Sequence, residues 1–288
     1  MKFLIFLLLT TPALAQTIFS IKDENKAPIS GASVFLMGDE NKLIAISDSI
    51  GTFQIKLIEK SSYLIHLIGY EDKICSNIEL ASNQTVVLKG NIYQLNGIVV
   101  PPVKLKRVKL INKPENWSFG ESNNVKTTFE RVTPVLIENE GYLRRFTLFT
   151  KQNIKGEVRI FRFIIHENDN GIPGKSVINK NVIGAIKDGK MIFDLDSLGL
   201  FLNSGSYYIG YETQNNGNFS NHAKKMETKK GTYLEYPMIF IKGKSTSGPK
   251  AFYRSNLKNW VEMTWSDEKA GKKGFNDFAY ELEMDVNR

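Results

Sequence analysis

Pro28-Ile29-Ser30-Gly31-Ala32-Ser33-Val34 is the stretch of this 288-residue chain that decides its fold. Pro28 fixes φ where a loop turns back into a strand, and Gly31 permits a backbone angle that other residues resist. An apolar run begins at Ala32. The stretch therefore predicts a tight turn that leads directly into a β-strand.

Two later stretches extend this pattern, Ser-Asp-Ser-Ile-Gly-Thr-Phe at 47–53 and Leu-Ile-Gly-Tyr at 67–70. Asp48 and Gly51 frame a tight connection between two strands. From residue 52 to 57 apolar and polar residues alternate, which predicts a strand with one buried and one wet face. Short strands at this spacing are typical of an all-β sandwich. The strands predicted for this region are 17–22, 32–37, 44–47, 52–57, 62–67, 71–74 and 85–89.

The order of these motifs, followed by Leu-Asn-Gly-Ile-Val-Val at 95–100, resembles the carboxypeptidase regulatory-like domain. The resemblance covers residues 17–100 and implies a transthyretin-like sandwich, which in Bacteroidota often precedes TonB-dependent receptors of the outer membrane. Such receptors continue with a plug and a barrel, whereas the remaining 188 residues (288 − 100) hold too few strands for a barrel. We therefore carry over no receptor function. Peptidase activity is not implied either, because the regulatory-like module has no catalytic residues.

Residues 1–15 are expected to be a cleaved signal peptide. Lys2 precedes an apolar run, and Ala13-Leu14-Ala15 gives the small-x-small pattern before Gln16. The single cysteine, Cys75, cannot form a disulfide within the chain, so stability must come from buried apolar surface. We expect an exported protein of the periplasm or the outer-membrane surface.

A basic segment separates two expected domains, residues 16–100 and residues 117–288. It begins with Pro-Pro and carries five Lys/Arg against one Asp/Glu over residues 101–116, which predicts a solvated linker. The whole chain has a formal net charge of +8. A positive surface suits nucleic acid, anionic glycan or the outer-membrane surface, and export argues against nucleic acid as a partner.

The second domain is also expected to be β-rich. Its last strand alternates apolar and polar residues from Phe278 to Val286, and we expect eight or more strands in two sheets. A strand ending in an Asn/Asp-rich turn with Pro-Gly at 166–175, followed by Gly-Ser-Tyr-Tyr at 205–208, resembles jelly-roll-like sandwich domains of exported bacterial proteins. The other predicted strands are 130–134, 143–150, 157–166, 191–195, 206–212, 236–241, 251–253 and 263–265.

The motif search gives no catalytic centre, so we expect a protein that is not an enzyme and needs no cofactor or metal. His66, His166 and His222 lack the His-Glu-x-x-His spacing of a zinc helix, and Gly-x-Ser-x-Gly is missing from the sequence. The run from Glu167 to Asp169 offers oxygen ligands for calcium, but its composition equally suits a turn.

Aromatic residues are the remaining sign of binding. Tyr253, Arg254 and Trp260 are the candidate binding residues, because rings with an apolar body and a polar tip suit sugar faces or protein anchors. Trp265 is expected in the core, because Met263, two positions away, is apolar.

Three functions fit this sequence. The first is an exported, non-catalytic binding or scaffold protein of the cell envelope that meets glycan or protein. The second is an envelope-polymer hydrolase, which predicts two loop carboxylates about 5–10 Å apart, one with a raised pKa. The third is a structural subunit of an outer-membrane complex, which predicts an exposed strand edge or a large apolar patch.

Overall fold

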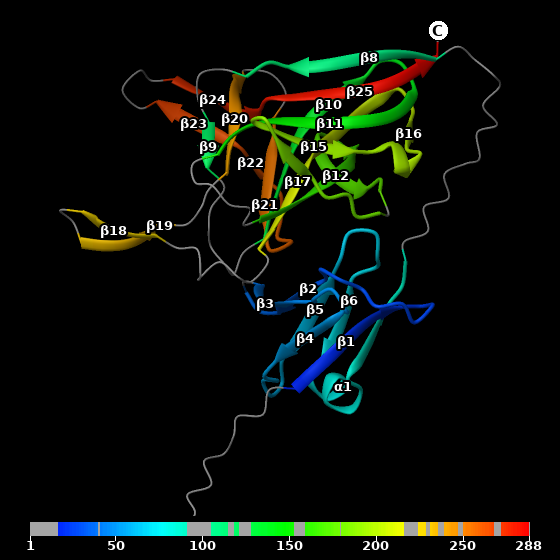
Figure 1. Cartoon of the computed structure of the whole chain (residues 1–288), viewed down its shortest axis with the longest axis vertical. Coiled ribbons are helices and arrows are strands. Elements are labelled where there is room, and N and C mark those ends of the chain that lie inside the picture. The colour runs from blue at the N-terminus through cyan, green and yellow to red at the C-terminus, as the bar shows by residue number, and fades with distance from the viewer. Residues whose placement is uncertain are drawn as a thin grey trace, which may run out of the picture.

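The computed structural model is all-β, as the sequence predicts (Figure 1). Strands dominate two units, a small one that ends near Gly90 and a larger one that starts at Leu105. Within the described residues no helix is long and apolar enough to cross a membrane. The structure describes residues 17–39, 41–90, 105–114, 118–120, 128–152, 159–178, 180–215, 224–228, 231–235, 239–246, 250–267 and 272–287.

The small unit is a sandwich of two sheets, with strand orders β4-β1-β7 and β3-β2-β5-β6. Their apolar faces meet in one core, where Phe19 stacks on Phe53 with ring centroids 5.2 Å apart. Every predicted strand has a counterpart, but the helix α1 (Asn77–Ser82), capped by the Ser76 hydroxyl, was not foreseen. The strands are β1 (Thr17–Asp23), β2 (Ser33–Leu36), β3 (Lys42–Ile46), β4 (Thr52–Ile55), β5 (Ser62–His66), β6 (Lys73–Ser76) and β7 (Thr85–Leu88).

Ser47 holds the stretch 28–34 in place. Its hydroxyl accepts a hydrogen bond from the Ala32 amide and donates one to the Ile29 carbonyl, each at 2.8 Å. The side chain is buried, so these bonds satisfy backbone groups that water cannot reach. Gly51 closes the same corner with φ +74°, where a Cβ atom would lie 2.7 Å from the Ile21 carbonyl oxygen.

We expect Ser47→Ala to lower the free energy of unfolding by about 1–3 kcal/mol, because the Ala32 amide would remain buried without an acceptor. Chemical denaturation of the full chain measures this. Ser30→Ala, at an exposed position of the same stretch, is the control and should change stability by less than about 0.5 kcal/mol. An equal effect of both substitutions would contradict the role given to Ser47.

The larger unit has two principal sheets around a second core, which confirms the expected eight or more strands. One sheet has the order β13-β12-β17-β10-β21-β22, and the other follows β14-β15-β11-β20-β24-β23 with β25, β8, β16 and β9 attached. The strands are β8 (Leu105–Asn112), β9 (Ser118–Gly120), β10 (Phe129–Ile137), β11 (Gly141–Gln152), β12 (Arg159–Asp169), β13 (Ile172–Ser176), β14 (Ala185–Lys187), β15 (Lys190–Asp194), β16 (Phe201–Leu202), β17 (Gly205–Asn215), β18 (Lys224–Thr228), β19 (Gly231–Glu235), β20 (Ile239–Thr246), β21 (Phe252–Ser255), β22 (Val261–Glu262), β23 (Thr264–Asp267), β24 (Lys272–Phe278) and β25 (Tyr280–Asn287).

The run considered for calcium is the end of a hairpin. Glu167 to Asp169 belong to β12, and Asn170 and Gly171 form the two-residue turn with φ of 54° and 88°. Asn-Gly is the preferred pair for such a turn, since both positions need a positive φ. The Asn168 side-chain oxygen accepts the Gly171 amide at 2.7 Å, so it serves the turn.

The basic segment is only partly a linker. Residues 105–112, expected to be solvated connector, form β8, which pairs antiparallel with β25 along its whole length. The expectation was wrong there because the positive charges meet a complementary strand. Arg107 bonds Asp285 at 2.7 Å, and Lys109 bonds Glu281 at 2.6 Å. The apolar alternate residues of β8 pack against the core.

The pairing of β8 predicts an acid-sensitive stability. The hydrogen bond from Arg107, together with Arg144, lowers the pKa of Asp285 below its ordinary value. Its stabilising contribution is therefore complete above about pH 4, the usual range of an unfolded aspartate, and is lost as the pH falls through the lowered value.

We expect Asp285→Asn to cost about 1–2 kcal/mol of unfolding free energy at pH 7. The difference from the unsubstituted chain should shrink as the pH falls below about 4. Denaturant titrations at a series of pH values measure it, with Asp39→Asn at an exposed position as the control. A deficit that stays constant down to pH 2 would contradict the ion-pair account.

Candidate functional site

One face of the six-stranded sheet carries a row of four charged side chains. Arg162 lies opposite Glu212, Glu212 opposite Glu130, and Glu130 opposite Arg254, on the neighbouring strands β12, β17, β10 and β21. Residues paired in register point to the same side of a sheet. Arg162 bonds Glu212 at 3.2 Å and Arg254 bonds Glu130 at 2.9 Å. Each buried carboxylate thus has its own guanidinium, which offsets the cost of its burial.

The small sandwich docks on this row. The Arg162 guanidinium donates to the Gly31 carbonyl at 2.7 Å, which links the sheet to the turn that opens β2. Ile68, at the tip of the small sandwich, is 8% exposed and belongs to the core cluster of the larger one. The Asn256 amide donates to the Asn41 carbonyl at 2.7 Å. Polar and apolar contacts therefore join the two units.

Leu257 makes the reciprocal apolar contact. It packs on the cluster of Phe35, Leu43 and Leu64, which lies on the outer face of the four-stranded sheet. Asn256 and Leu257 have φ of 48° and 59°. A leucine in this left-handed region costs on the order of 1–3 kcal/mol, so the docked position must compensate for it. Each sandwich thus inserts one apolar side chain into the other: Ile68 of the small sandwich packs in the larger one, and Leu257 of the larger sandwich packs on the small one.

We expect the double variant Ile68→Ser/Leu257→Ser to separate one calorimetric unfolding transition into two, because each sandwich has its own core. The matched control is Ile18→Ser/Ile183→Ser, at sites 61% and 56% exposed, which should keep one transition. Persistence of a single transition in the junction variant would contradict the coupling.

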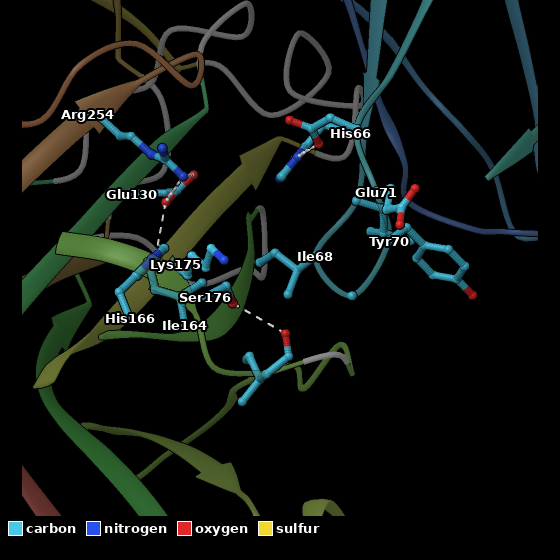
Figure 2. Close-up of a pocket in the computed structure, with 14 residues that line it drawn as sticks. His66, Ile68, Tyr70, Glu71, Glu130, Ile164, His166, Lys175, Ser176 and Arg254 are labelled. Carbon is cyan, nitrogen blue, oxygen red and sulfur yellow. Dashed lines mark hydrogen bonds and ion pairs between the residues drawn. The ribbon is translucent and has the colours of Figure 1, made fainter. Parts of the chain in front are cut away.

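The docked tip leaves a pocket of about 350 Å³ against the sheet (Figure 2). In this junction pocket the His66 Nδ1 lies 2.6 Å from Asp72, and the His166 Nδ1 lies 2.9 Å from the Gly174 carbonyl. The His166 Nε2 is 3.8 Å from the Glu130 carboxylate. The pocket is lined by His66, Leu67, Ile68, Gly69, Tyr70, Glu71, Asp72, Glu130, Ile164, His166, Lys175, Ser176, Ile178 and Arg254.

The two histidines of this pocket differ in their electrostatics. Burial opposes protonation of His66, but the hydrogen bond to Asp72 and the carboxylates of Asp72, Glu212 and Glu130 raise its pKa above the ordinary value. Burial dominates at His166 and lowers its pKa. His66 therefore takes up a proton at higher pH than His166.

A larger depression lies on the same sheet face, farther from the junction, with a volume of about 760 Å³. We call it the Trp260 groove. Its lining combines aromatic rings with small polar groups. Its lining residues are Pro134, Val135, Leu136, Asn168, Asn170, Gly171, Ile172, Ser206, Tyr208, Lys250, Phe252, Trp260 and Glu262. The mixture of rings, amides, a hydroxyl and charged groups suits a polar ligand with apolar faces.

Two of the three predicted binding residues lie together, and the third does not. The Arg254 guanidinium lies over the Trp260 ring, 4.5 Å from its centroid, and the His166 ring meets Trp260 edge-on at 5.4 Å. These three residues lie between the two pockets, because His166 and Arg254 line the junction pocket and Trp260 lines the groove. Tyr253 is one residue along β21 and faces the opposite side, where Arg131 lies 5.7 Å from its ring.

Other residues considered from the sequence contribute little to these sites. Cys75 is buried, and burial raises the pKa of its thiol to about 11, which disfavours a nucleophilic thiolate. Within the described residues no group of three His, Cys, Asp or Glu has metal-binding geometry. His222 and the side chain of Trp265 lie outside the described part of the chain.

Glu130, Glu212 and Arg162 were missed by the sequence reasoning. A weak signal was available, because Arg162 interrupts an apolar run in Arg-Ile-Phe-Arg-Phe-Ile-Ile. A charged residue at a strand position flanked by aromatic residues needs a buried partner. Its carboxylate partner, Glu212, stands 50 residues away in sequence (212 − 162), so no local pattern joins the two.

Comparisons with known proteins add little to this description. No protein-family model and no curated protein matches the chain. A solved structure of infectious bursal disease virus, Gx strain, aligns with 94% of this chain at 8% identity and a TM-score of 0.28, and the chain spans 62% of its length. BcpA, the major pilin subunit of Bacillus cereus, aligns at 11% identity and a TM-score of 0.19, over 95% of each chain. Neither likeness supports an inference about function.

Proposed function

We propose that this chain is an exported, non-catalytic binding protein of the bacterial cell envelope that holds a glycan in the Trp260 groove. The observation that carries the proposal is the position of Trp260, which lines a groove of about 760 Å³ together with Tyr208 and Phe252. Sugar rings present apolar faces to aromatic side chains and hydroxyl groups to amides. Asn168, Asn170 and Ser206 supply polar groups of that kind.

The stack behind Trp260 supports this role. Arg254 covers one side of the indole and is itself held by Glu130. A side chain fixed in this way loses little conformational entropy when a ligand binds, which favours affinity. In this proposal the small sandwich, with its resemblance to the carboxypeptidase regulatory-like domain, is a docking module at the periplasmic or outer-membrane surface.

The hydrolase alternative would need a free pair of acids. One pair of buried acids among the described residues is Glu130 and Glu212, which are paired in register across β10 and β17. Each is bonded to an arginine. A general acid must carry a proton, and an arginine partner opposes protonation of the carboxylate. A general base needs a free lone pair, and the arginine occupies it. This arrangement favours binding over hydrolysis.

The structural-subunit alternative draws on β8, which among the described strands pairs with β25 alone and leaves one edge open. Its charged residues Lys106, Arg107 and Lys109 oppose pairing with another strand, as is common for protected edges. A partner protein at the cell surface is the alternative that a negative glycan result would favour.

Binding of the chain from Gln16 onward to a panel of soluble and insoluble glycans tests the proposal. Trp260→Ala should weaken binding about five- to thirtyfold, since loss of a stacking ring removes about 1–2 kcal/mol. Tyr253→Ala is the matched control, because its ring faces the other side of β21 and should leave affinity unchanged. Binding to no glycan, or equal losses in both variants, would contradict the proposal.

A further inference from the structure

The loop that joins β21 to β22 carries both Leu257 and Trp260. It begins with a turn from Ser255 to Lys258, in which the Lys258 amide donates to the Ser255 carbonyl at 3.0 Å. The two central residues, Asn256 and Leu257, have positive φ of 48° and 59°. Such angles are typical of a type I′ turn, which prefers Asn followed by Gly. Leu257 therefore occupies a position that favours glycine.

The chain also contains the favoured version of this turn. Asn170-Gly171 forms the turn between β12 and β13, with φ of 54° and 88°. A leucine in the left-handed region is strained by its Cβ atom, whereas a glycine is not. Leu257 has a contact that offsets this strain, because it packs on the outer apolar cluster of the small sandwich, which contains Phe35 and Leu43. The docking contact thus accounts for a leucine that the turn itself disfavours.

Hydrogen bonds of Asn256 hold the turn against both units. Its side-chain amide donates to the carbonyl of Asn41, in the small sandwich, at 2.7 Å. Its side-chain oxygen accepts the Thr128 amide at 2.9 Å, and its backbone amide donates to the Thr128 carbonyl at 3.0 Å. Asn256 therefore connects the residue before β3 to the residue before β10. One polar and one apolar side chain fix this turn at the junction.

We propose that docking of the small sandwich positions Trp260, so that Asn256 and Leu257 are positioning residues of the Trp260 groove. Trp260 follows Leu257 by three residues and directly precedes β22. The Arg254 guanidinium over its ring comes from β21, on the other side of the same turn. A turn that leaves the small sandwich therefore carries the indole away from its place in the groove. This role rests on the proposed binding of a glycan there.

The effect on affinity follows from the fraction of molecules in which Trp260 is in place. Weaker docking that leaves about a tenth to a third of the molecules competent lowers the affinity for glycan about three- to tenfold. A bound glycan strengthens the docking by the same factor, because coupling between two sites is reciprocal. The small sandwich then contributes to binding, although every described residue that lines the groove belongs to the larger one.

Fluorine nuclear magnetic resonance of the chain from Gln16 onward, labelled with fluorotryptophan, tests the positioning without a ligand. The chain has three tryptophans, and Trp260→Phe identifies the Trp260 signal. Leu43→Ala is the decisive variant, because it reduces the cluster under Leu257 yet lies 217 residues from Trp260 in sequence (260 − 43). It should shift or split the Trp260 signal. Val86→Ala, in the separate inner core of the small sandwich, is the matched control and should leave that signal unchanged.

Leu257→Gly separates docking from turn strain, because glycine relaxes the turn and removes the contact with the small sandwich. The Trp260 signal should change as it does in Leu43→Ala. In glycan titrations both variants should lose about three- to tenfold in affinity, and Val86→Ala should lose none.

A Trp260 signal that stays unchanged in Leu43→Ala or in Leu257→Gly, or that changes equally in Val86→Ala, would overturn the positioning role. Undiminished glycan affinity of both variants would overturn it as well. If the unsubstituted chain binds no glycan, the proposed function fails, and the fluorine signals still decide whether the small sandwich positions Trp260.

Discussion

The buried Arg162 guanidinium is the interaction on which the rest of this structure depends. It bonds Glu212 within the six-stranded sheet and the Gly31 carbonyl of the other sandwich. A buried ion pair contributes little net stability, because desolvation of both charges offsets their attraction. Its bond to Gly31 nevertheless favours one geometry, since an orientation of the sandwiches that breaks this bond removes a buried acceptor from the guanidinium. Arg162 therefore specifies how the two units meet.

The orientation of the small sandwich divides one sheet face into two sites. Near Gly31 and Ile68 the face is covered, and the junction pocket lies between the units. Farther along the same strands the face is open and forms the Trp260 groove. Arg254 belongs to both regions, because it closes the charged row on one side and covers Trp260 on the other. His166 also lines the junction pocket and meets the Trp260 ring edge-on, so a change at the junction would reach the groove through Arg254 and His166.

The strands were largely predictable, because their signals are local. Alternation along residues 52–57 and from Phe278 to Val286 shows which side chains face the core, and Asn170-Gly171 specifies its hairpin through backbone angles alone. The prediction of a linker over residues 101–116 was wrong at β8, because it too used local signals only. Lys and Arg on alternate positions read as solvated when the acidic strand that pairs with them lies more than 170 residues away.

The sequence by itself determined the all-β class, the approximate strands and the presence of an aromatic candidate at Trp260. Only the tertiary structure decided which charges meet, that Tyr253 faces away from Arg254, and that Ile68 and Leu257 cross between the sandwiches. The physical reason is the nature of a sheet. A period of two tells which residues of one strand share a face, but neighbouring strands and their register are set by burial and pairing between segments far apart in the chain.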